Sequence, residues 1–344
     1  MSTPDKITNE GTLLDVLTSP REVLVEYIPS LKSPLVILGA GGKMGPSLAY
    51  LAYRSARAAN SNLEIIAVDR FQDGGSREWL ETKGIRTVKK DLLNRSDVES
   101  LPDTENLIYL VGMKFGTMSN PSMTWSINAL IPANICHRYQ GTRMVALSTG
   151  NVYPLVEVAG GGALESDSQN PVGEYAISCL ARERVFEYNS QVNHTPIVLI
   201  RLNYAVELRY GVLYDIAQKV FANQPVDVTM GYFNCIWQGD ANDMIIRSLP
   251  LAKSPVKYLN LTSPRIFSVR EIALKFGELF GHKVNIIGKE APTALVSNAG
   301  QASQLLGEPS TPLDTILAWI ANWIEQGGRS LGKPTHFEVR DGGY

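Results

Sequence analysis

The chain has 344 residues, about twice the usual length of one domain and enough to bury a large hydrophobic core. Hydrophobic residues make up 44% and charged residues 19%, an ordinary globular composition that argues against a disordered or fibrous protein. The 32 basic and 34 acidic residues give a net charge of −2 without a basic block, which argues against nucleic-acid binding.

Membrane insertion, secretion and metal binding are also not expected. The longest apolar runs are strand-sized, far below the ~20 residues that a spanning helix needs. The N-terminus MSTPDKITNE is polar and has no signal-peptide core. Three scattered cysteines and four histidines form no CxxC or HxxxH pattern. We therefore predict no metal site, no membrane contact and a reducing, cytoplasmic location.

The first segment, residues 1–32, is predicted to be a helical extension. Its apolar residues recur at roughly helical spacing on both sides of the Ser19-Pro20 break.

Residues 33–202 change to an alternation of short apolar runs and helical stretches. The runs predict strands at 35–38, 63–68, 87–90, 107–111, 143–147 and 197–201. Helices are predicted between them at 46–60, 124–139 and 174–190. Buried strands separated by helices at this rhythm are typical of an α/β domain of the Rossmann type, a doubly wound parallel sheet covered on both faces.

Residues 203–344 are less regular and richer in aromatic residues and glycine. Helices are predicted at 211–223, 268–280 and 312–325. We interpret this part as a smaller, mixed α/β substrate-binding region, with residues 236–248 returning to the Rossmann domain.

The first motif that indicates chemistry is LVILGAGGKMGPSLAYLA at 35–52. A glycine-rich turn between a strand and a helix lets a diphosphate approach the backbone, and the helix then offers free N–H groups and its positive dipole end. The loop residues predicted to hold the diphosphate are Gly39, Gly42, Lys43, Met44 and Gly45.

Asp69 closes the second strand, 24 residues after Gly45, where a carboxylate can accept hydrogen bonds from the adenosine ribose. Asp69 would repel a 2′-phosphate, which favours NAD over NADP. Arg70 follows at once and can receive that phosphate, so NADP stays open.

Later motifs resemble the extended short-chain dehydrogenase/reductases, which include the NAD-dependent nucleotide-sugar epimerases and dehydratases. The resemblance covers about residues 34–325. Its matching positions, in chain order, are the glycines at 39–45, Asp69, Asp91, Leu92, Asn128, Ser148, Thr149, Tyr153, Pro171, Tyr175 and Ser178. It implies that Asp91, Leu92, Val111 and Gly112 contact the cofactor. The two helices at 124–139 and 174–190 are those with which relatives pair, so it also implies a homodimer.

The resemblance further implies a proton relay beside the nicotinamide. Thr149 would hydrogen-bond the substrate oxygen, and Tyr175 would give or take the proton during hydride transfer. The family has a lysine four residues after the tyrosine, but this chain has Cys179. Without a nearby cation a phenol keeps a pKa near ~10, too weakly acidic for efficient proton exchange at neutral pH.

Three residues are candidates for a substitute cation. Lys114, in VGMK at 111–114, resembles a cofactor-reaching lysine of UDP-galactose epimerases, although a solvated loop lysine fits equally well. Arg182 and Arg184 lie seven and nine residues after Tyr175 and are predicted to be surface charges.

On the substrate side, Phe233 takes the position of the arginine with which relatives grip sugar-nucleotide phosphates. The polar and aromatic residues predicted to line a substrate cleft are Asn203, Tyr204, Arg209, Trp237 and Gln238. The resulting hypothesis is an NAD-dependent epimerase/dehydratase-like oxidoreductase acting on a carbohydrate-like alcohol or ketone. The alternative is an NAD(P)-binding regulatory or scaffold protein whose catalysis is impaired because position 179 is Cys.

Overall fold

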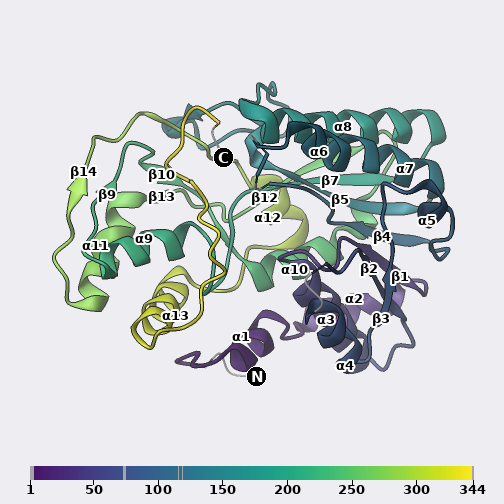
Figure 1. Ribbon diagram of the computed structural model, residues 1–344, viewed down its shortest axis with the longest axis horizontal. Coiled ribbons are helices and arrows are strands. Elements are labelled where there is room, and N and C mark those ends of the chain that lie inside the picture. The colour runs from purple at the N-terminus through teal and green to yellow at the C-terminus, as the bar shows by residue number, and fades with distance from the viewer. Residues whose placement is uncertain (1–3, 73–74, 115, 118, 343–344) are drawn as a thin grey trace.

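The computed structural model describes residues 4–72, 75–114, 116–117 and 119–342, and a parallel sheet lies at its centre (Figure 1). The sheet has seven strands in the order β12-β7-β5-β4-β1-β2-β3. These are β1 (Leu35–Leu38), β2 (Ile65–Asp69), β3 (Arg86–Lys89), β4 (Asn106–Tyr109), β5 (Arg143–Thr149), β7 (Ile197–Leu202) and β12 (Lys257–Leu261). The chain order reverses between β1 and β4, and ligands of open α/β sheets bind at the carboxyl ends of strands beside such a reversal.

Helices cover both faces of the sheet. One face packs against α2 (Glu22–Tyr27), α3 (Gly45–Ala58) and α10 (Gln238–Arg247), and the other against α5 (Arg95–Glu99), α7 (Ile131–Arg138) and α8 (Gly173–Asn193), as Figure 1 shows. Alternate side chains of β1 enter opposite cores, because successive strand residues point to opposite faces. This accounts for the unbroken apolar runs that predicted the strands.

The predicted α/β architecture is confirmed, with one addition from the C-terminal half. All six expected strands are present, with bounds shifted by at most two residues. The edge strand β12 was not predicted, and it extends the sheet beside β7 from within the region interpreted as substrate-binding. α10 lies on α3, where Gln238 and Asn242 each donate to Ser47 Oγ at 2.9 Å.

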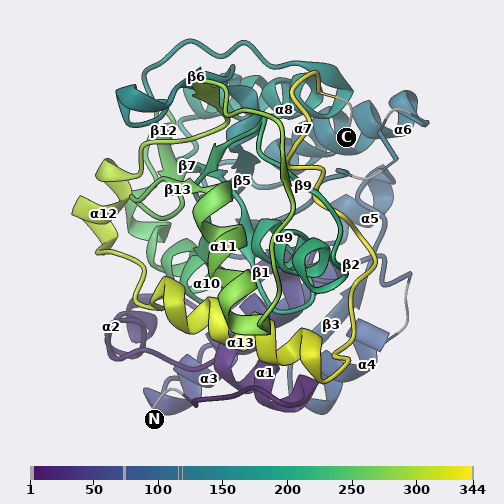
Figure 2. The same ribbon diagram turned by 90° about the vertical axis from the view of Figure 1, so that its left-hand side faces the viewer.

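The remainder of the C-terminal half forms a second core. It is built from α9 (Val212–Phe221), α11 (Val269–Phe280) and α13 (Leu313–Glu325), with two-residue strand pairs at its edges. Beyond α13 the chain runs back across this region toward the start of α8 (Figures 1 and 2). There the backbones of Gly342 and Gly173 touch, since a Cβ on Gly173 would lie 2.3 Å from the Gly342 oxygen.

The N-terminal segment joins the two cores. α1 (Glu10–Leu17) contributes Leu13 and Leu17 to the second core, whereas α2 packs under the sheet. Trp319 Nε1 donates to the Pro4 carbonyl at 2.9 Å, and Arg21 forms an ion pair with the buried Asp240 of α10. Among the described residues, no helix combines the length and apolar character needed to cross a membrane.

Candidate functional site

The glycine-rich turn brings the start of α3 against the end of β1. Gly39 has φ +82°, a conformation that side chains with a Cβ rarely adopt, and its N–H donates to the Val68 carbonyl at 2.9 Å. A Cβ on Gly45 would lie 2.5 Å from the Ala40 oxygen, so only glycine lets the helix approach so closely. The first N–H groups of the 14-residue helix α3 therefore face the end of the sheet.

A cavity of about 130 Å³ opens at this point, between the ends of β1, β2 and β4. Eight of the predicted cofactor residues line it: Gly39, Gly42, Asp69, Arg70, Asp91, Leu92, Val111 and Gly112. Complete small-molecule sites typically measure ~300–1,000 Å³, so this cavity has room for only one part of a ligand as large as a dinucleotide.

The two carboxylates of this cavity are fixed by their own backbones. Asp69 Oδ1 accepts the Phe71 N–H at 2.9 Å, and a Cβ on Gly41 would lie 2.9 Å from its carboxyl carbon. Asp91 Oδ1 accepts the Leu93 N–H at 3.0 Å. Each keeps an oxygen that can accept from a sugar hydroxyl or an amine, which fits the adenosine half of a dinucleotide.

The predicted proton relay lies beyond the end of β5. Tyr175, near the start of α8, is half-buried, and its hydroxyl lies beside the side chain of Thr149, the last residue of β5. Thr149 Oγ1 also donates to Asn151 Oδ1 at 2.9 Å. The structure thus brings together the two residues expected to hold a reacting oxygen.

Cys179 lies directly beside the phenol, where the family lysine would be. Its side chain is fully buried and faces Tyr175. Burial is the main cause that raises the pKa of Tyr175 well above its usual value, and the Cys179 thiol raises it further. Arg182 offsets part of this rise. Burial also raises the pKa of the Cys179 thiol. Both groups are therefore protonated at neutral pH.

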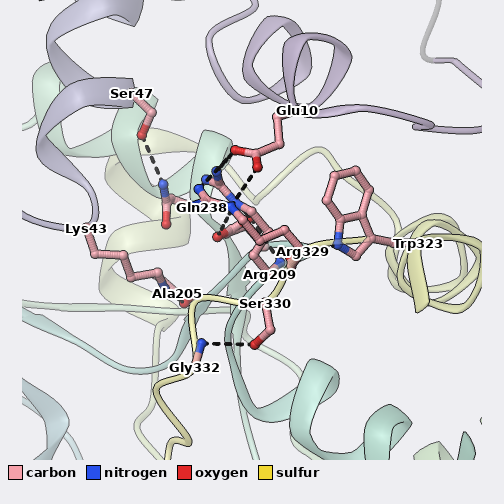
Figure 3. Close-up of polar contacts among 11 residues, drawn as sticks. Glu10, Lys43, Ser47, Ala205, Arg209, Gln238, Trp323, Arg329, Ser330 and Gly332 are labelled. Carbon is pink, nitrogen blue, oxygen red and sulfur yellow. Dashed lines mark hydrogen bonds and ion pairs between the residues drawn. The ribbon is translucent and has the colours of Figure 1, made fainter. Parts of the chain in front are cut away.

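Two lysines lie close to this pair, since Lys114 acts electrostatically on both Cys179 and Lys43. Burial lowers the pKa of Lys114 to about 8, while the nearby Asp215 of α9 and Cys179 act to raise it. Lys43 Nζ donates to the Ala205 carbonyl at 2.9 Å and stands 3.6 Å above the centre of the Tyr210 ring (Figure 3 draws the carbonyl contact). The residue as a whole is exposed, but desolvation of its ammonium by the groups around it lowers the pKa of Lys43 to about 7.

Arg182 corrects one expectation. Its side chain is only 5% exposed, so its predicted surface position is wrong, whereas Arg184 is exposed as predicted. Nη1 donates to the Leu147 carbonyl at 3.0 Å, and Nη2 donates to Asn128 Oδ1. The surface position was predicted from the number of helical turns between Arg182 and Tyr175. A long helical side chain leans toward the N-terminal end of its helix, so Arg182 reaches back over part of that distance. The sequence did contain one signal of a buried arginine: Asn128, at a position that matches the family, has a side-chain oxygen that can accept from a buried donor.

The residues predicted to line a substrate cleft have mostly structural contacts. Trp237 is 2% exposed and packs on Trp319, with ring centres 5.4 Å apart. Gln238 binds Ser47, and Arg209 forms an ion pair with Glu10 of the N-terminal segment (Figure 3). Arg209 also forms an ion pair with Glu207.

Two further members of that set lie near the end of β7. Asn203 is buried and donates to Asn234 Oδ1 at 2.9 Å, and a Cβ on Gly150 would lie 3.2 Å from its carboxamide carbon. Tyr204 is half-buried and has φ +45°. Substrate contact by this set stays a prediction.

The family model described as "NAD dependent epimerase/dehydratase family" matches residues 35–206, half of the chain. The chain belongs to this family. The matched span of this family member runs from β1 to β8 (Ala205–Val206) and so contains the cavity, Thr149, Tyr175 and Cys179. No curated protein matches the chain.

Solved structures similar to this family member share its fold at low identity. UDP-glucuronic acid 4-epimerase from Bacillus cereus, in complex with NAD, has a TM-score of 0.70 and 17% identity over 85% of this chain and 96% of its own. UDP-glucose 4-epimerase from Thermotoga maritima, with UDP-glucose, has a TM-score of 0.68 and 14% identity, and the match covers 85% of this chain and 99% of its own. MoeE5, in complex with UDP-glucose and NAD, has a TM-score of 0.67 and 19% identity, and the match covers 86% of this chain and 99% of its own.

Proposed function

We propose that this protein binds NAD at the carboxyl ends of β1, β2 and β4 and transfers hydride at a carbinol carbon of a carbohydrate-like substrate, as an epimerase or oxidoreductase. The observation that carries the proposal is the Tyr175–Thr149 pair at the end of β5, on the same edge of the sheet as the glycine-rich cavity. Membership of the family and the NAD complexes of similar structures support it.

The cavity residues fit the cofactor. Gly39 and Gly45 leave no side chain between α3 and a diphosphate, and Asp69 offers acceptors for ribose hydroxyls. The Asp69 carboxylate, beside Gly41, favours NAD over NADP, because a 2′-phosphate would be repelled by its negative charge. When bound, NAD would supply the hydride acceptor or donor.

The protein's own contribution is to hold and protonate the reacting oxygen. Thr149 would bind a substrate hydroxyl or carbonyl, and Tyr175 would exchange its proton. Because the pKa of Tyr175 is raised, its phenol at neutral pH is a proton donor toward a carbonyl. It becomes a base only where positive charge stabilises the phenolate.

The substrate class is proposed as a sugar or sugar nucleotide. Two of the similar structures hold UDP-glucose. The phosphate-gripping arginine expected of such enzymes is replaced by Phe233, which is 1% exposed and packs on Phe267 with ring centres 5.9 Å apart. A sugar nucleotide would therefore be held without a guanidinium at this position.

A cofactor-binding protein without turnover is the second candidate, favoured by Cys179 and the raised pKa of Tyr175. A redox-sensing version of it has less support. Sensor cysteines are exposed and have a lowered pKa, whereas Cys179 is fully buried and its pKa is raised.

Calorimetry with NAD and NADP, followed by incubation of the NAD complex with UDP-glucose, UDP-glucuronic acid and simple sugars, tests the proposal. We expect NAD to bind more tightly than NADP, and at least one sugar to generate reduced-nicotinamide absorbance or an epimer. Tyr175→Phe should bind NAD equally and lose turnover. NAD binding without any turnover would favour the second candidate, and no binding of either dinucleotide would refute both.

A further inference from the structure

We propose that Arg182 is a positioning residue that supplies, from two turns further along α8, the positive charge absent from position 179. The same side chain holds segment 111–113 at the cofactor cavity. This inference rests on the proposed function, because it assigns Arg182 a role in the proton exchange of Tyr175.

The side chain reaches the turn where the family lysine would stand. Position 182 lies ~10 Å along the helix axis from Tyr175, at about 1.5 Å per residue. Its guanidinium extends back to Asn128 Oδ1, and the Asn128 amide in turn donates to Ser178 Oγ at 2.9 Å. Arg182 thus contacts the network around Ser178, the residue next to position 179.

The guanidinium also holds segment 111–113 in place through Asn128. Asn128 Oδ1 accepts the Met113 N–H at 2.9 Å, and its amide donates to the Met113 carbonyl at 3.1 Å. A Cβ on Gly112 would lie 2.7 Å from Arg182 Nη2, so any larger residue there would displace the charge. Asn128 lies in a π-helical turn (Ser126–Leu130), a rare geometry that is frequent at functional sites.

Within the described part of the chain, no carboxylate is bonded directly to the guanidinium of Arg182. Among the described residues, none of the ion pairs includes Arg182, and its Nε has no hydrogen-bond partner. The neighbouring Glu183 is occupied by Arg201, at 2.8 Å, and by Ser148 Oγ, at 2.5 Å. A buried charge that is not bonded to a carboxylate destabilises a fold, which indicates that it serves another purpose.

That charge acts on the two groups beside it. Arg182 lowers the pKa of Tyr175 and of Cys179, against the larger opposing effect of burial. Tyr109 and Glu183 also face the guanidinium, and Lys114 likewise lowers the pKa of Cys179. Since arginine stays protonated at any working pH, it is a permanent source of this effect.

A site-specific titration in the protein without cofactor tests the proposal. Tyr175 is replaced by a genetically encoded fluorinated tyrosine, whose lowered pKa brings the phenol into a range where the fold survives, and its ionisation is followed by absorbance. We expect Arg182→Met to raise the pKa of this phenol by about one unit, a tenfold change in ionisation constant. Arg182→Lys should restore part of the shift, which a purely structural role would not predict.

The control is Arg184→Met on the same helix, an exposed residue paired with Glu187, which should leave the titration unchanged. If Arg182→Met fails to fold, Gly112→Ala displaces the same guanidinium and should also raise the pKa. An unchanged phenol pKa in these variants, or an equal shift in Arg184→Met, would overturn the proposal. The readout needs neither NAD nor substrate, so it can succeed or fail independently of the proposed function.

Discussion

Restoring the family lysine should destabilise this protein unless Arg182 is removed as well. Cys179 is fully buried, and Arg182 follows three residues later on α8. Cβ atoms at this spacing are about 5–6 Å apart, and because both long side chains lean toward the N-terminal end of α8, we take this distance as the order of the separation between their charges. With an effective dielectric constant of ~20, two positive charges at that separation repel by about 3 kcal/mol. Cys179→Lys alone should therefore lower the free energy of unfolding at pH 7, to which the bulk of the added side chain contributes further.

The assay is urea unfolding of four proteins: wild type, Cys179→Lys, Arg182→Met and the double variant. The double variant should be about 3 kcal/mol more stable than the sum of the single effects predicts, because the repulsion is absent. A parallel cycle with Arg184→Met should be additive, since that charge is exposed. Additivity within ~0.5 kcal/mol in the Arg182 cycle would show that the two positions do not share one cation site, and would refute the reasoning.

Four further outcomes are expected. Asp69→Asn should weaken NAD binding about tenfold or more in calorimetry, because hydrogen bonds to a charged acceptor contribute ~1.5–3 kcal/mol; unchanged affinity would contradict the ribose contact. Gly45→Ala should lower the free energy of unfolding by about 1–3 kcal/mol and reduce NAD binding, since its Cβ meets backbone at 2.5 Å, whereas Gly160→Ala, with no atom within 4 Å, should do neither. Affinity for NAD should fall from pH 6.5 to 8.5, as Lys43, with a pKa of about 7, loses the charge that attracts a diphosphate; Lys43→Met should flatten this dependence, and an equal slope in that variant would contradict the assignment. Sedimentation should show a homodimer that Leu130→Glu, at a position 51% exposed, converts to monomer, and a wild-type monomer would reject the dimer.

The sequence was most informative where one local pattern determines one structure. Apolar runs separated by helices predicted the sheet, because strands buried on both faces need apolar residues at every position. The glycine turn and Asp69 predicted the cavity, since their spacing fixes where the first two strands end. β12 was missed because Asn260 interrupts its short run, KYLNL, which therefore lacks the continuous apolar stretch of the central strands.

Side-chain roles were harder to predict, because they depend on tertiary contacts. Trp237 and Gln238 have the residue types of a binding cleft, but they are buried against α13 and α3. Arg209 was predicted to bind substrate without knowledge of Glu10, which lies 199 residues earlier in the chain. Arg182 was assigned to the surface because its spacing from Tyr175 does not reveal the direction of its side chain.

A crystal structure of the protein with NAD tests the central claim most directly. We expect the adenosine ribose at Asp69, the diphosphate at the start of α3, and the nicotinamide ribose facing Tyr175, with the guanidinium of Arg182 still behind Gly112. A dinucleotide bound away from the ends of β1, β2 and β4, or a nicotinamide remote from the tyrosine, would contradict it.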